Sequence, residues 1–97
     1  MDIEEYSNLN NVYKNAQKYL GKNVDIKISN RKNKKFMVLN PNNNKWIHFG
    51  SMGYKDFTFT GDKNKQYRYF RRAMNIKGNW INDKYSPNNL AINILWQ

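Results

Sequence analysis

The chain has 97 residues, of which 39% are hydrophobic and 15% aromatic, with a formal net charge of +10 and no cysteine. This length suits a single domain with a small, ring-rich core, because two cores of useful size would not fit. The lack of cysteine excludes disulfides, thiolate nucleophiles and zinc sites with cysteine ligands.

The positive charge lies mainly after residue 20, because acidic residues outnumber basic ones before that point. Clustered Lys and Arg side chains bind polyanions by releasing counterions from phosphate groups. An alternative explanation is codon bias, since Asn and Lys abound here, but that bias does not account for where the arginines fall. The charge therefore favours a polyanionic partner such as DNA or RNA.

The first residues are acidic and polar, unlike those of a signal peptide. No apolar run approaches the roughly 18 residues needed to cross a bilayer. We therefore expect an intracellular protein that makes no membrane contact.

Residues 2–20 are predicted to form a helix, because apolar side chains recur at three- and four-residue steps and Gly21 follows. The acidic side chains fall in the first turn and the lysines later, which suits the helix dipole. The apolar stripe is narrow and interrupted by asparagine, so we expect the helix either to pack weakly on the domain or to dock a partner protein. This divides the chain into an N-terminal helix, 1–21, and a single α+β domain, 22–97.

Four segments have the pattern of strands in an antiparallel meander. Residues 24–28 alternate apolar and polar side chains, which is typical of a half-buried strand. Residues 35–39 and 45–50 are the next two strands, and the Asn-Pro start and Asn run of 40–44 predict a hairpin turn between them. Residues 54–60 alternate as well and predict a fourth strand.

Two helices are predicted after the strands. The fold class is therefore α+β, a small antiparallel β-meander of three or four strands packed with two C-terminal helices, plus the N-terminal helix. Asp62 is a suitable N-cap for a helix that runs to about Ile76. After a loop anchored by Trp80, Ser86 as N-cap and Pro87 at the first helical position begin a short second helix. The inward-facing side chains of this helix are expected to be Leu90, Ile94 and Leu95.

The helix at 62–76 has two contrasting sides. At 100° per residue, Tyr67, Phe70 and Met74 share one side, which we expect to face the core. The opposite side has no acidic residue to form intrahelical ion pairs, and the planar fork of arginine is suited to phosphate. The alternative is an ordinary solvated helix face. The candidate nucleic-acid-binding side chains here are Lys65, Arg68, Arg72 and the flanking Arg71, with Tyr69 among them to stack on a base.

The loop before the second strand supplies a second basic patch. Residues 29–35 are rich in charge and asparagine, so we expect a solvated loop. A basic loop beside a basic helix can grip a nucleic-acid backbone, and exposed rings such as Trp46 or Tyr54 would add stacking. No zinc finger, RNP motif, GXXG loop or glycine-rich phosphate loop is present, which gives no support to sequence-specific readout. The loop candidates are Arg31, Lys32, Lys34 and Lys35.

His48 is the only histidine, and a lone histidine needs a nucleophile, an orienting acid or a metal to catalyse a reaction. Asp56 could lie beside it across the turn that contains Gly50 and Gly53, two residues expected to adopt positive φ. Such a pair could serve a small nuclease or other hydrolase, or it could hold the turn in place, and we favour the structural role. The sequence therefore predicts no catalytic residue, no metal site and no cofactor.

Residues 35–96 contain three distinctive motifs, KxMVxNPxxxKWIHFGxMGYxDFT, KxxRYxxRAxxIKGxW and KYSPNNLxxxxLW. In this order they resemble a small uncharacterised domain found in nucleocytoplasmic large DNA viruses, the giant viruses, and in some phages. The resemblance implies a viral protein located in the infected host cell, in the cytoplasm or viral factory, and in the virion. It implies no established activity, and the helix at 2–20 lies outside it.

These observations favour a non-enzymatic viral protein that binds DNA or RNA largely through phosphate contacts, without sequence specificity. The alternative is a structural virion component, such as a minor capsid protein, that uses exposed aromatic side chains for protein contacts. In either case the N-terminal helix is the expected docking element for a viral or host protein.

Overall fold

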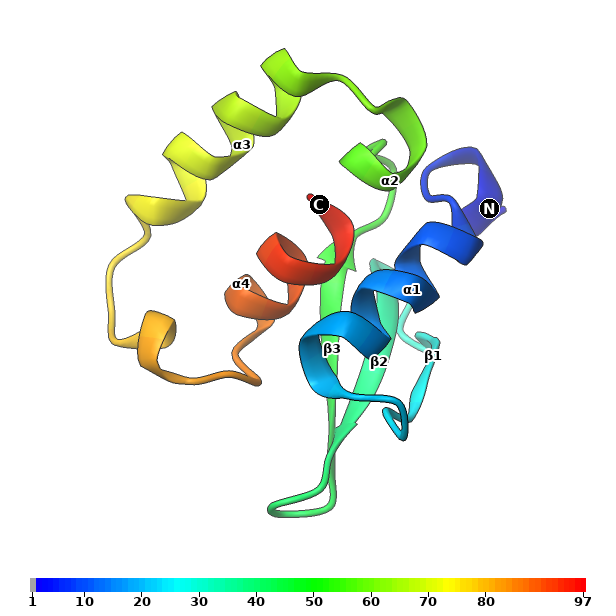
Figure 1. The fold of residues 1–97 in the computed structure, drawn as a ribbon, viewed down its shortest axis with the longest axis vertical. Coiled ribbons are helices and arrows are strands. Elements are labelled where there is room, and N and C mark those ends of the chain that lie inside the picture. The colour runs from blue at the N-terminus through cyan, green and yellow to red at the C-terminus, as the bar shows by residue number, and fades with distance from the viewer. Residues whose placement is uncertain (1) are drawn as a thin grey trace.

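The structure, a computed structural model, describes residues 2–97 and has the α+β architecture expected from the sequence. An antiparallel sheet of three strands is covered by helices from both ends of the chain, as Figure 1 shows. The elements in chain order are η1 (Ile3–Glu5), α1 (Leu9–Leu20), β1 (Ile26–Ile28), β2 (Lys34–Asn40), β3 (Lys45–Ser51), α2 (Phe57–Thr60), α3 (Lys63–Met74), η2 (Trp80–Asn82), α4 (Pro87–Leu90) and the π-helical η3 (Ala91–Leu95).

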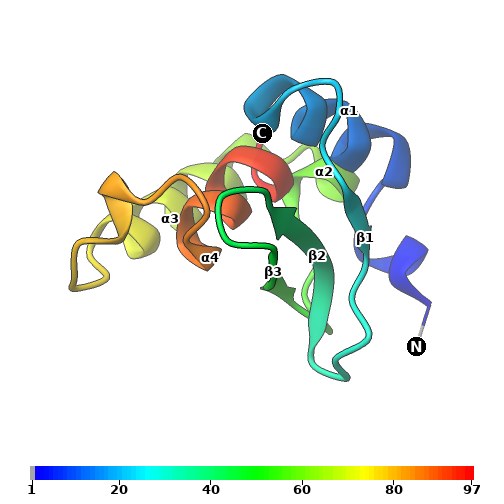
Figure 2. The ribbon, with the colours of Figure 1, turned by 90° about the horizontal axis from the view of Figure 1, so that it is seen from below.

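The sheet is a meander in the order β1-β2-β3. The β2–β3 hairpin pairs Phe36 with Phe49 and Val38 with Ile47, so its turn falls in the asparagine-rich segment, as predicted. β1 is a short strand at the edge of the sheet, where Ile26 pairs with Val38. Figure 2 shows the helices gathered on one side of this sheet. Because side chains alternate along a strand, the rings of Phe36 and Phe49 both point to that side and are fully buried.

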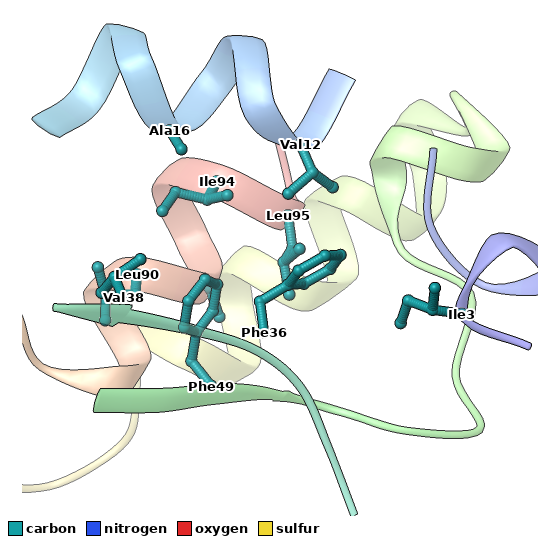
Figure 3. Packing of buried hydrophobic residues seen from close by; sticks show 10 residues of the cluster. Ile3, Val12, Ala16, Phe36, Val38, Phe49, Leu90, Ile94 and Leu95 are labelled. Carbon is teal, nitrogen blue, oxygen red and sulfur yellow. The ribbon is translucent and has the colours of Figure 1, made fainter. Parts of the chain in front are cut away.

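The core lies between the sheet and the helices (Figure 3). Val12 and Ala16 of α1 meet Ile94 and Leu95 of η3, and these side chains are 0% or 1% exposed. Burying one aliphatic side chain of this kind contributes about 1.5–3 kcal/mol. The apolar stripe of α1 is therefore part of the core rather than a loosely packed surface. That α1 docks a partner protein stays a prediction. Only the polar side of the helix is free for such a contact, because the apolar side is in the core.

The prediction of one continuous helix at 2–20 is wrong in its first part, because the helix is interrupted before Leu9. The Asn8 side chain accepts the Asn11 N–H at 3.1 Å and thereby caps α1, which leaves η1 as a separate 3-10 turn. The break is held by a long-range contact, because the Asp56 N–H donates to the Tyr6 carbonyl at 3.1 Å. The C-terminal end of α1 is as predicted, with Gly21 at a φ of 103°.

The fourth strand predicted at 54–60 is wrong, because this segment turns into the short helix α2. The Asp56 carboxylate accepts the Thr58 N–H at 3.0 Å and caps the helix, and Gly61 ends it in the left-handed conformation at a φ of 60°. The alternating Phe and Thr side chains match a strand pattern. The aspartate at one end and the glycine at the other fix a helical turn instead.

The C-terminal helix follows the sequence prediction. The Ser86 hydroxyl accepts the Asn89 N–H at 3.2 Å, and Pro87 occupies the first turn. Leu90, Ile94 and Leu95 are fully buried, as expected from their spacing. Within residues 2–97, no helix is both long enough and apolar enough to cross a membrane.

α3 begins after the Asp62 cap as predicted and forms an outer arm of the molecule, beside α4 (Figure 1). The side expected to face the core is largely exposed instead, since Tyr67 is 61% and Met74 56% accessible and only Phe70 is half-buried. The inward side carries Ala73 and Tyr69, and the Tyr69 ring stacks on Trp96 with centroids 4.3 Å apart and planes 6° from parallel. The helix thus has two opposed apolar stripes. The stripe that contains Tyr69 and Ala73 packs against the body of the domain.

Candidate functional site: a cationic cleft beside α3

A cleft with a volume of about 940 Å³ lies between α3, the start of β2, the turn after β3 and the C-terminal helix. Two hydrogen bonds set the position of α3 beside it. Gln66 Nε2 donates to the Trp96 carbonyl at 2.8 Å, and Asn88 Nδ2 donates to the Ala73 carbonyl at 3.2 Å. Together with the Tyr69–Trp96 stack, these contacts hold the arm at a fixed distance from the sheet.

Basic side chains line this cleft from two sides. One side is the sheet and the turn that follows it, and the other is the inward-turned half of α3. We call these residues the cleft cations: Lys34, Lys55, Lys65, Arg68 and Arg72.

The cleft cations have no carboxylate partners. Across residues 2–97 the sole ion pair joins Lys35 and Asp56. Asp56 also lines the cleft, but its charge is already matched by Lys35. Since no acid offsets the cleft cations, their positive potentials add within one recess.

Most of the remaining lining is apolar or aromatic, with Ser51 and Asn88 as polar members. Ile76, Ala91 and Leu95 form part of it, together with the stacked rings of Tyr69 and Trp96. The cleft therefore combines cationic sides with an apolar portion, which is a composition that can take both charged and ring-shaped parts of a ligand.

The turn at one edge of the cleft depends on its glycines. Gly50 and Gly53 have φ of 82° and 93°, as expected from the sequence. A Cβ built on Gly50 would lie 2.7 Å from Leu95 Cδ1 and 3.1 Å from Lys35 Cβ. Gly50 is therefore required both by its backbone conformation and by the close passage of Lys35 and Leu95.

Lys35 is a correction to the sequence analysis, which counted it among the accessible basic residues at the junction of the loop and the second strand. It belongs to β2 and is only 2% exposed. Its Nζ donates to Asp56 Oδ2 at 2.9 Å and to the Tyr54 carbonyl at 2.5 Å. Burial lowers the pKa of Lys35, and the adjacent Asp56 opposes that shift. Lys35 is thus committed to a structural contact and is withdrawn from the candidate phosphate ligands.

Asp56 is the centre of that contact. Besides Lys35, its carboxylate accepts hydrogen bonds from the Ser7 hydroxyl and from the N–H and hydroxyl of Thr58. The cluster joins the segment before α1, the strand β2 and the cap of α2. This supports the structural interpretation of Asp56 over a catalytic one.

The other predicted candidates divide into two groups. Lys34 brings the basic loop and the basic helix to the same cleft. Arg31 and Lys32 are exposed in the preceding turn and do not line it, and Arg71 points to the outer side, with its guanidinium 5.8 Å from the ring centroid of Tyr67. The predicted candidates that line the cleft are Lys34, Lys65, Arg68, Tyr69 and Arg72.

Lys55 is a cleft residue that the sequence reasoning missed. It lies just beyond the positive-φ turn at Gly53, within the segment that was expected to be a strand. The signal was the aspartate that follows it, because Asp56 is the N-cap of α2 and so takes the preceding lysine out of the sheet, where its Nζ lies 5.1 Å from the ring centroid of Phe59.

The Tyr69 ring is partly occupied by its own chain, because one of its faces lies against Trp96. Burial raises the pKa of its hydroxyl, while Arg72 opposes that shift, so the phenol stays neutral at physiological pH. Stacking of Tyr69 on a base stays a prediction. Tyr54 also lines the cleft and is 71% exposed, which leaves its ring available.

His48 lies outside the cleft lining. Its Nδ1 is 2.7 Å from the Ser29 hydroxyl oxygen, and it pairs with Met37 across the hairpin. Burial together with the charges of Arg31 and Lys34 lowers the pKa of His48. Asp56 contacts Lys35, Ser7 and Thr58 instead, so the His48–Asp56 pair considered from the sequence is not formed. Residues 2–97 contain no cluster of three or more His, Asp or Glu side chains that could hold a metal ion.

One comparison with known proteins gives a match. The sequence model of a family of unknown function, DUF5754, matches residues 24–73. This segment runs from before β1 almost to the end of α3 and contains every one of the cleft cations. No curated protein and no solved structure matches the chain.

Proposed function

We propose that this chain, which belongs to the DUF5754 family of unknown function, binds nucleic acid through its phosphates, without sequence specificity and without catalysing a reaction. The cleft cations would neutralise phosphates and release their counterions. Arg68 and Arg72 would each offer a planar fork that donates two parallel hydrogen bonds to one phosphate. Contacts of this type position a nucleic acid and carry no base information.

The observation that carries this proposal is the convergence of unpaired cations from separate elements on one recess. An ordinary solvated helix face would be convex and would meet only water. Here Lys65, Arg68 and Arg72 of α3 share a cleft with Lys34 of β2 and with Lys55, which follows β3. Like charges held close together are destabilising, so such an arrangement favours a bound anion.

The basic residues outside the cleft have a secondary place in this proposal. Arg31 and Lys32 are exposed near Lys34, and Arg71 is exposed on α3. Exposed charges of this kind raise the rate of encounter with a polyanion and weaken in effect as salt is added. We therefore assign them a steering role and leave the direct contacts to the cleft cations.

No catalytic residue is part of the proposal. His48 is engaged with Ser29, and Asp56 with Lys35, Ser7 and Thr58. A nuclease would need a general base free to approach the reacting phosphate.

A protein-contact role, such as that of a structural virion component, is the second candidate. It is favoured by the outer side of α3 and the segment that follows, where large apolar side chains face water. Tyr67, Met74, Ile76 and Ile81 are between 53% and 61% exposed. Viral origin, the infected cell as location and a virion role stay predictions.

Binding of labelled single-stranded and double-stranded oligonucleotides tests the proposal, with Arg68→Glu/Arg72→Glu as the disrupting variant. The matched control is Lys14→Glu/Lys22→Glu, which makes the same change in net charge at exposed positions of α1 and the turn after it. We expect the first variant to abolish binding at low salt and the control to weaken it only slightly. Equal losses in both variants would mean that net charge alone, and not the cleft, governs binding.

A further inference from the structure

We propose that the cleft beside α3 takes a single strand of nucleic acid in preference to a double helix, with bases against its apolar portion and phosphates at its cationic sides. This inference rests on the proposed function and specifies the form of nucleic acid that the site recognises.

The size of the cleft is the first reason. Its volume of about 940 Å³ falls within the range of about 300–1,000 Å³ that is typical of small-ligand sites. A recess of this size can admit nucleotides of a flexible strand one after another. The nucleotides of a double helix cannot enter in this way, because their bases are paired, so a duplex would touch only the rim of the cleft.

The distribution of chemistry within the cleft is the second reason. A double helix presents phosphates and sugars on its outer surface and keeps its bases stacked inside, so it has no apolar surface that could pack against the apolar part of the lining. The lining of the cleft contains the apolar side chains of Ala91 and Leu95 together with the cleft cations. A single strand has both parts exposed, with charged phosphates along one edge and apolar base faces along the other.

The aromatic side chains are the third reason. Proteins that bind single strands without sequence preference combine a basic groove with rings on which bases stack. Tyr54 lines the cleft with 71% of its surface exposed, and the Tyr69–Trp96 pair lies in the same lining as an already ordered stack. A base that enters can extend that stack or lie on Tyr54, close to the unpaired charges.

Fluorescence anisotropy with three labelled nucleic-acid probes, each about 20 nucleotides long, tests this inference. The probes are oligothymidylate, a duplex of the same length, and an abasic strand with the same phosphate count. We expect oligothymidylate to bind at least about five-fold more tightly than either of the other two, since that is the lower range for stacking of one base on a ring. This preference would appear even though the duplex has the higher charge density.

The variant Tyr54→Ala locates the bases within the cleft, with Tyr67→Ala as the matched control on the outer side of α3. Both tyrosines are mostly exposed, so neither change should affect folding. We expect Tyr54→Ala to weaken binding of oligothymidylate by about five-fold and to leave the abasic strand unaffected, while Tyr67→Ala changes neither.

The outcomes separate the two proposals. Equal or tighter binding of the duplex or of the abasic strand would overturn the single-strand inference and leave phosphate binding intact. Unchanged binding of oligothymidylate to Tyr54→Ala would overturn the placement of bases beside this ring. Failure of all three probes to bind in 50 mM salt would overturn the proposed function itself.

Discussion

Lys35 Nζ lies 2.9 Å from Asp56 Oδ2, and the two side chains are only 2% and 1% exposed. This buried ion pair joins the second strand to the cap of α2, and Ser7 links it to the segment before α1. The pair also lines one end of the cationic cleft. Because it fixes the direction of the chain after β3, it keeps Lys55 in the lining of the cleft.

Removing one partner of this pair is expected to destabilise the fold strongly. Lys35→Met leaves the Asp56 carboxylate buried without its counter-charge, at a cost of about 3–5 kcal/mol in the free energy of unfolding. Urea denaturation followed by circular dichroism measures this. Lys34→Met is the neighbouring control and should change stability by less than about 0.5 kcal/mol, as surface substitutions usually do. Similar stabilities of the two variants would contradict the structural role of the pair.

Two glycine substitutions should differ in their effects although both positions have positive φ. A Cβ at Gly53 has no atom within 4 Å, so Gly53→Ala should lower the free energy of unfolding only through the strained backbone, by about 1–2 kcal/mol. Gly50→Ala has the same backbone cost and also places a methyl group 2.7 Å from Leu95 Cδ1, which adds about 1–3 kcal/mol of overpacking. Thermal denaturation of the two variants checks the order, and an equal loss would argue against the close approach at Gly50.

His48 should make stability depend on pH below about 6.5, its ordinary pKa. Its pKa in the folded chain is lowered from the ordinary 6.5 by burial and by Arg31 and Lys34. Below pH 6.5 the unfolded chain therefore binds a proton more readily than the folded chain, so stability falls as pH falls and the effect vanishes above that pH. His48→Gln should flatten this part of the profile in urea denaturation. A wild-type stability that rises on acidification would reverse the expected sign.

Adjacent arginines of α3 offer a matched test of which side of the helix binds. Arg72 lines the cleft and Arg71 lies over the Tyr67 ring on the outer side, yet both are exposed and both are in the last turn. Arg72→Glu should weaken binding of a single strand by about ten-fold or more, the value of one charged hydrogen-bonded contact. Arg71→Glu makes the same change in charge and helix dipole and should have a clearly smaller effect. A larger loss for Arg71→Glu in anisotropy measurements would place the site on the outer side.

Local patterns were sufficient to predict much of this fold. The hairpin of β2 and β3 follows from alternation and from the asparagine-rich turn, and the C-terminal helix follows from Ser86 and Pro87. These elements are determined by neighbours in sequence, through turn and cap chemistry.

Most of the errors arose where distant residues decide the outcome. Lys35 stands at the junction of a basic loop and a strand, and its burial depends on Asp56, which lies 21 positions later. The expected fourth strand is an error of another kind, because its local caps, Asp56 and Gly61, are visible in the sequence but the alternation of Phe and Thr favoured a strand. On α3, two apolar stripes are compatible with the sequence, and the choice between them depends on Trp96 at the far end of the chain.

The cleft itself was only half predictable. The sequence indicated that Lys34 and the basic side of α3 bind phosphate, but it could not show that they share a recess or that Lys55 joins them. Their convergence depends on the stack of Tyr69 on Trp96 and on the turn at Gly50. The glycines of the turn are visible in the sequence, but the pairing of Tyr69 with Trp96 and the close approach of Leu95 to Gly50 leave no trace in the local pattern.

The salt dependence of single-strand binding tests the central claim most directly. If the cleft cations Lys34, Lys55, Lys65, Arg68 and Arg72 all contact phosphates, a plot of log affinity against log salt should have a slope of about −3.5. Loss of two contacts in Arg68→Glu/Arg72→Glu should reduce that slope to about −2 or remove measurable binding. An affinity that does not change with salt, or a variant with the same affinity and the same slope as the wild type, would contradict phosphate binding in this cleft.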